Sequence, residues 1–187
     1  MKRRDVLGRG AAGVATAAGL ALAASLGGCA SAPQVQDYAG EKPTLDLREY
    51  FNGTLDAYGV FTDRAGKVVK RFTVLMVCTW QGDEGVLNED FTYSDGSKQQ
   101  RIWRIQKLPD GAYIGRAGDV VGQAHGQARG NALRWAYTLN LPVDGTVYQV
   151  QFDDWMYLMT NKVMLNKATM SKLGFKLGEV TLSFTKR

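Results

Sequence analysis

Hydrophobic and polar side chains alternate one by one along several stretches of the chain. Residues 133–141, 148–152 and 180–184 each carry a large apolar side chain at every second position. This two-residue period is typical of β-strands with one face buried and the other solvated. Residues 72–80 are more continuously apolar, and we expect this strand to be buried on both faces.

Turn residues separate these stretches at short intervals. Ser94-Asp95-Gly96, Pro109-Asp110-Gly111 and Val143-Asp144-Gly145 have the Asp-Gly chemistry of tight hairpins. Residues 46–51 fit one helical turn before the first strand. No long amphipathic helical pattern is present, and residues 164–172 are the one ambiguous stretch. The sequence therefore predicts an all-β domain, an antiparallel meander of about 8–10 strands closing into a barrel.

The N-terminus has the organisation of an export signal. A cationic start is followed by a short, weakly apolar stretch over residues 11–26. Leu26-Gly27-Gly28-Cys29 resembles the lipobox of bacterial lipoproteins, in which the cysteine is acylated and the chain is cut before it. Arg3-Arg4 resembles a twin-arginine signal, but Val6 stands where that pattern usually has Phe, so the export route stays open.

These features divide the chain into a signal peptide (1–28), a lipidated tether (29–45) and a β-barrel domain (46–187). The lipobox resemblance implies a membrane anchor, with palmitate or a similar acyl chain on Cys29. Two or three acyl chains are needed for stable anchoring. Ala30 follows the cysteine where inner-membrane retention typically has Asp, which favours the periplasmic face of the outer membrane.

Charge and cysteine content narrow the function classes. The segment before Cys29 has four basic residues and one acidic residue, so its removal lowers the formal charge from +5 to +2. No Lys/Arg block remains that would indicate nucleic-acid binding. With Cys29 acylated, Cys78 is the single free cysteine, and its apolar neighbours predict a buried, inert thiol.

Several strings resemble the DUF3833 family of uncharacterised bacterial lipoproteins. They span nearly the whole chain after Cys29: Phe51-Asn52-Gly53, Gly59-Val60-Phe61-Thr62-Asp63, Arg101-Ile102-Trp103, Gly118-Asp119-Val120-Val121-Gly122, Gly130-Asn131-Ala132-Leu133-Arg134-Trp135 and Asp153-Asp154-Trp155-Met156. The resemblance implies no catalytic residues. The expected barrel is also similar to lipocalins, although the lipocalin Gly-x-Trp start is missing, so that similarity concerns the fold alone.

Residues 122–130 predict a strand with two unlike faces. One face carries Gln123, His125, Gln127 and Arg129, and the other only Gly and Ala. If the small face points inward, it leaves room for a ligand inside the barrel. The alternative is that the glycines serve bulges, bends or a loop, and both interpretations stay open.

Aromatic and charged residues on neighbouring strands are candidates for lining such a cavity. Arg101 shares its face with Trp103, so it is the better interior candidate, with a carboxylate or phosphate headgroup as its expected partner. Arg134 alternates with Trp135 and should point outward. Asp153 and Asp154 should diverge, because neighbours on a strand face opposite sides. The candidate ligand-binding residues are Arg101, Trp103, Trp135, Tyr137, Asp154 and Trp155.

Motifs for catalysis, cofactors and metals are missing from the sequence. His125 is the single histidine, and no phosphate loop, dinucleotide fingerprint or Cys/His metal spacing occurs. We therefore expect no cofactor and no metal. The first hypothesis is a lipid-anchored barrel that binds an apolar or fatty-acyl ligand. The second is a structural lipoprotein that docks a protein through Trp155 or Tyr157. The third hypothesis is an enzyme, which would need Asp119, Asp153 or Asp154 within hydrogen-bond reach of His125 or Arg101.

Overall fold

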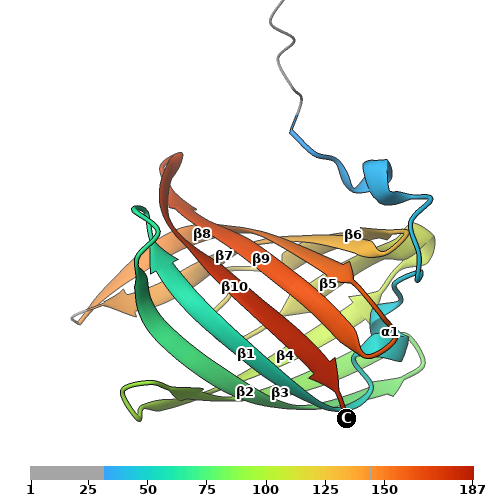
Figure 1. Cartoon of the computed structure of the whole chain (residues 1–187), viewed down its shortest axis with the longest axis horizontal. Helices are drawn as coiled ribbons and strands as arrows, with labels where there is room; N and C mark the ends of the chain where they lie inside the picture. Colours follow the sequence, from blue (N-terminus) through green and yellow to red (C-terminus); the bar gives the residue numbers. More distant parts are fainter. Residues whose placement is uncertain (1–31, 144) are drawn as a thin grey trace, which may run out of the picture. The chain divides into compact units, whose positions relative to one another are not determined.

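The computed structural model describes residues 32–143 and 145–187. Cys29 and the expected signal peptide lie outside the described residues. Residues 33–187 form a compact unit built around one closed antiparallel sheet of ten strands (Figure 1). The strands are β1 (Gly53–Asp63), β2 (Val68–Gln81), β3 (Glu84–Tyr93), β4 (Lys98–Lys107), β5 (Ala112–Arg116), β6 (Ala124–Arg129), β7 (Ala132–Val143), β8 (Thr146–Leu158), β9 (Val163–Lys172) and β10 (Phe175–Lys186).

The topology is a simple meander. Each strand pairs with the next one along the chain, and β1 pairs with β10 to close the barrel. The expected hairpin chemistry is present: Gly96 and Gly111 take positive φ angles of 81° and 68°, a region that glycine enters without steric cost. The short helix η2 (Pro109–Gly111) occupies the turn between β4 and β5. The sequence-based prediction of an all-β barrel is confirmed, and the ambiguous residues 164–172 belong to β9.

The alternation of apolar and polar residues matches the two sides of the barrel wall. On β7, Leu133, Trp135 and Leu139 are buried, whereas Ala136 between them is exposed. The prediction for β2 was wrong in one respect. Val74, Met76 and Cys78 are buried, but Leu75 and Val77 are 40% and 47% exposed. In a closed single-layer barrel the outer face has no second layer to cover it, so even apolar residues there meet solvent.

One end of the barrel is plugged by the helical turn α1 (Leu47–Tyr50). Asp46 caps this turn by accepting from the Arg48 backbone N–H at 2.9 Å, and it also accepts from Lys107 Nζ at 2.6 Å. The Tyr50 hydroxyl donates to the Phe184 carbonyl at 3.2 Å, and Trp80 Nε1 donates to the Phe51 carbonyl at 2.7 Å. These bonds to several strands hold the plug in place.

Residues 33–45, expected to be a tether, pack against the barrel. The short helix η1 (Val35–Tyr38) places Tyr38 against the rings of Trp155 and Tyr157, with centroids 5.9 and 5.3 Å away. The Leu45 backbone N–H donates to the Gly130 carbonyl at 2.8 Å. Val35 and Leu45 are buried, so this segment contributes to the core despite its lack of a periodic pattern. Among the described residues, no helix is long and apolar enough to cross a bilayer.

Candidate ligand-binding cavity

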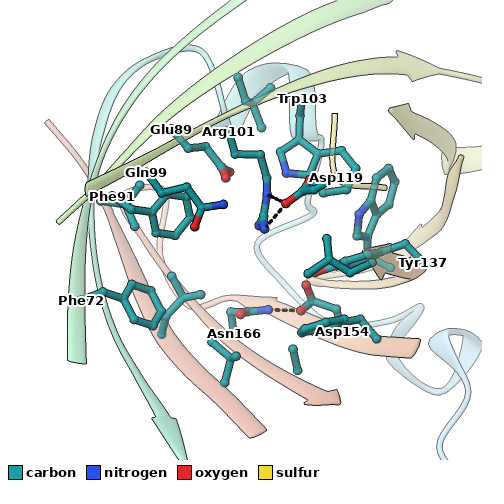
Figure 2. A pocket seen from close by; sticks show the side chains of 18 of the residues that line it. Phe72, Glu89, Phe91, Gln99, Arg101, Trp103, Asp119, Tyr137, Asp154 and Asn166 are labelled. Atoms are coloured by element: carbon teal, nitrogen blue, oxygen red, sulfur yellow. Dashed lines mark hydrogen bonds and ion pairs between the residues drawn. The ribbon is translucent and has the colours of Figure 1, made fainter. Parts of the chain in front are cut away.

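The barrel contains a cavity of about 870 Å³. This volume lies within the range of small-molecule sites and far above the voids of a normally packed interior. Aromatic rings make up much of its wall: Phe51, Phe61, Phe72, Phe91, Tyr93, Trp103, Trp135, Tyr137, Phe152 and Phe184. Figure 2 shows several of these rings around a central space, with a few polar side chains directed into it. The chemistry is that of a site for a largely apolar molecule.

The two ends of the cavity differ in access. Leu47 and Phe51 of the α1 plug line one end and are only 2% and 3% exposed. At the other end the lining reaches the exposed residues Ser97, Lys98 and Val147, in the β3–β4 and β7–β8 hairpins. The cavity therefore has a floor at the plugged end and a mouth among these hairpins.

A cluster of charged residues lies inside the apolar wall. Glu89 and Arg101 are directly opposite each other on β3 and β4. Arg101 donates from Nε and Nη2 to the same oxygen, Asp119 Oδ2, at 3.0 and 2.6 Å. Asp119 comes from the β5–β6 loop, which is fixed to β7 by an Asn140 N–H donating to the Asp119 carbonyl at 2.8 Å. The Arg101 guanidinium also lies 5.6 Å from the centre of the Phe91 ring, within the range of a cation–π contact.

A second polar group lies on the opposite wall. Asp154 on β8 is 6% exposed and accepts a hydrogen bond from Asn166 Nδ2 on β9 (Figure 2). Asn166 also donates to the Trp155 carbonyl at 3.1 Å. Burial raises the pKa of Asp154 to about 7, against the opposing hydrogen bond from Asn166. Burial likewise raises the pKa of Glu89 to about 7, although Arg101 favours its ionised form.

The structure brings five of the six candidate ligand-binding residues to the cavity wall. These are Arg101, Trp103, Trp135, Tyr137 and Asp154. Trp103 packs edge-on against Trp135 and Tyr137, with ring centroids 5.7 and 5.5 Å apart, and Tyr137 stacks on Phe152 at 4.9 Å.

Trp155, the sixth candidate ligand-binding residue, does not line the cavity. It lies on the outer side of the wall against Tyr38 and Tyr157. Since Asp154 points inward, its neighbour on the strand must point outward. The rings proposed for docking, Trp155 and Tyr157, are partly buried, and Tyr38 packs against both of them.

The small-residue face of β6 points inward, but it does not line the cavity. Ala124, Gly126 and Ala128 are buried, as the inward interpretation predicted. The space beside them is taken by Trp135: a Cβ placed on Gly126 would lie 2.2 Å from that ring, and one on Gly115 would lie 2.4 Å from it. The small residues thus accommodate a tryptophan instead of leaving room for a ligand.

Residues expected outside the site are found outside it. Arg134 and Asp153 form an ion pair at 2.7 Å on the outer surface, so Asp153 and Asp154 diverge as predicted. His125 is exposed beside Gln123. Cys78 is a buried free thiol, and burial raises its pKa to about 12, which leaves it protonated and unreactive.

Two polar residues of the cavity, Glu89 and Asn166, were missed by the sequence analysis. Both could have been found from the two-residue period of their strands. Glu89 lies two residues from Leu87 and two from Phe91, and Asn166 lies two residues from Met164 and two from Ala168, so each shares a face with its apolar neighbours. A polar residue in phase with buried apolar neighbours is a candidate for an interior site. Within the described residues, no group of His, Cys, Asp and Glu has the arrangement of a metal site.

Fold and cavity together define a closed antiparallel β-barrel of the lipocalin-like class. It is similar in fold to the S-type phycobiliprotein lyase CPES from Guillardia theta, with a TM-score of 0.55 and 9% sequence identity over 83% of this chain and 98% of the lyase. The chain belongs to the DUF3833 family, a family of proteins of unknown function, whose model matches residues 23–186. A search of curated proteins finds no match.

Proposed function

We propose that this protein is a lipid-anchored envelope lipoprotein whose barrel holds an apolar ligand. The observation that carries the proposal is the aromatic cavity of about 870 Å³, open at one end and plugged by α1 at the other. An interior at normal packing density would leave no such space, and maintaining it forgoes dispersion and burial energy. A bound apolar molecule restores those contacts.

The anchor in this proposal is an acylated Cys29 on the periplasmic face of the outer membrane. Its support is the lipobox-like string before Cys29 and the Ala30 that follows it. Cys29→Ser should move the protein from the membrane fraction to the soluble fraction and abolish labelling by palmitate. Cys78→Ala is the matched control, because it removes the other cysteine and leaves the lipobox intact. Unchanged membrane association of Cys29→Ser would refute the anchor.

The alternatives have weaker support. Asp119 meets Arg101 inside the cavity, which is one of the pairings an enzyme would need. Among the described residues lining the cavity, however, there is no histidine or cysteine to act as base or nucleophile beside that pair. In a docking role only part of the Trp155 and Tyr157 rings would be accessible, because Tyr38 packs against both.

The ligand is tested by extraction. Protein purified from its native membrane in mild conditions should release a stoichiometric apolar molecule into organic solvent, detected by mass spectrometry. Ala168→Phe adds a ring to the cavity wall and should reduce this yield severalfold. Ala136→Phe adds the same atoms on the exposed side of β7 and should not. Equal yields from the two variants would refute binding in the cavity.

A further inference from the structure

The interior polar cluster has more hydrogen-bond acceptors than donors. Three carboxyl groups, Glu89, Asp119 and Asp154, face a single guanidinium, that of Arg101. Figure 2 shows these side chains on opposite walls with open space between them. The other cationic residues of the lining, Lys70 and Lys98, lie at the mouth, and Lys70 already pairs with Asp95 at 3.1 Å.

The positive charge of Arg101 is already compensated by neighbouring carboxyl groups. Two of its N–H groups converge on Asp119 Oδ2, and Glu89 lies across from it on the neighbouring strand. Any carboxylate or phosphate placed beside Arg101 would also be close to carboxyl groups in a poorly solvated cavity. Like charges are costly there because water does not screen them. The headgroup expected from the sequence, an anion on Arg101, is therefore disfavoured.

Several acceptors remain unused. Asp119 Oδ1 is buried and has no hydrogen-bond partner among the described residues. Asp154 accepts from Asn166 through Oδ1 alone. No hydrogen bond to the Glu89 carboxyl is found in the described part of the chain. Asp119 Oδ1, a buried acceptor without a donor, costs free energy, so a ligand that supplies an N–H or O–H group there is stabilised by filling it.

From this arrangement we infer that the ligand is an amphiphile whose polar end is a hydrogen-bond donor, cationic or neutral, and is not an anion. Its apolar part lies against the phenylalanine and tryptophan rings, and its donor group lies between Glu89, Asp119 and Asp154. A protonated amine satisfies the site best, because it adds charge complementarity to its hydrogen bonds. This inference rests on the proposed function and specifies its ligand class.

The test compares three probes that have tails of the same length and differ in their polar ends. They are dodecylamine, dodecanol and dodecanoate, each used below its micellar concentration. Binding to the purified full-length protein is measured by calorimetry at pH 7.5. We expect dodecylamine to bind at least about tenfold more tightly than dodecanoate, with dodecanol between them. Dodecanoate binding as tightly as dodecylamine would overturn the inference. If the Lys98→Gln variant then lost its dodecanoate binding, the carboxylate would be assigned to the mouth of the cavity, beside Lys98.

A double variant, Glu89→Gln with Asp154→Asn, removes the charges while keeping the shapes. It should lose the preference for dodecylamine, whereas dodecanol should bind within about twofold of the wild-type affinity, which also verifies the fold. The control is Asp90→Asn with Asp153→Asn, the outward neighbours on the same strands. It should keep the wild-type order of affinities. An unchanged preference in the interior variant would overturn the inference.

The outcomes separate the two proposals. If none of the probes binds and no molecule is extracted, both the proposed function and the inference fail. If the probes bind in the cavity but the anion is preferred, the ligand class is wrong and the binding function stands.

Discussion

The barrel interior is filled along β5 and β6 and hollow beside the other strands, β1–β4 and β7–β10. The filled side carries the smallest residues: Gly115, Ala124, Gly126 and Ala128 are all buried there. The hollow side carries large ones, including Phe72, Phe91 and Phe152. The size of the wall residues is therefore a poor guide to where space remains. What matters is the residue that faces them, and Trp135 fills the volume that the glycines leave.

The largest effect is expected from removing the Trp135 side chain, which fills the space beside the glycines. Trp135→Ala should lower the free energy of unfolding by about 4 kcal/mol, because it leaves the glycine face without a packing partner. Phe91→Ala should cost about 1–2 kcal/mol, since this ring is only half-buried, whereas Trp135 is 4% exposed. Urea denaturation of both variants measures the difference. Equal losses would mean that the two sides are packed alike.

The converse test adds volume to each side. Gly126→Val should destabilise the protein by about 3 kcal/mol, because its side chain would overlap the Trp135 ring. Ala168→Val points into the cavity and should change stability by less than about 1 kcal/mol. Thermal or urea unfolding gives both numbers. A well-tolerated Gly126→Val would show that Trp135 can move aside.

The hollow side should also make stability depend on pH. Glu89 and Asp154 have pKa values raised to about 7 by burial, so the folded protein retains protons that the unfolded chain has released. This stabilisation is complete below the unfolded pKa values and is lost as pH rises through 7. Between pH 6 and pH 8, ionisation of each group should lower the free energy of unfolding by about 1.4 kcal/mol.

Urea unfolding at several pH values checks this dependence. Glu89→Gln with Asp154→Asn should flatten the profile over this window, and Asp90→Asn with Asp153→Asn should not. A wild-type stability that rises from pH 6 to pH 8 would contradict the burial of these two groups.

The smallest effect is expected for the ion pair on the outer surface. Asp153→Asn breaks the pair with Arg134, in which both side chains are more than 40% exposed. The expected change in the free energy of unfolding is below about 0.5 kcal/mol, because water screens such pairs. A loss of several kcal/mol would show that Arg134 and its contact with Trp155 hold the β8 wall in place.

Much of the fold and part of the site follow from sequence periodicity. The two-residue period of β4 places Arg101 on the same side of the barrel wall as Trp103. The same period in β8 places Asp153 and Asp154 on opposite sides. The same rule would have placed Trp155 outside and Glu89 and Asn166 inside. These differences came from choosing residues by type instead of by their position in that period.

Other features have no signal in the local pattern. Residues 33–45 have no periodicity, yet Val35 and Leu45 are buried because the barrel offers a surface beside Gly130. Asp119 lies in a loop, where the two-residue period of a strand does not apply. Its contact with Arg101 depends on how the β5–β6 loop folds back along β7.

The sequence by itself determined the antiparallel meander and the inner face of most strands, because a two-residue period and Asp-Gly turns act over a few neighbouring residues. The tertiary structure alone decided that the cavity lies away from the glycine-rich strand and that its one guanidinium is already paired. Both outcomes depend on side chains from strands distant in sequence meeting across the barrel. Spacing along the chain does not encode how those side chains share the interior volume.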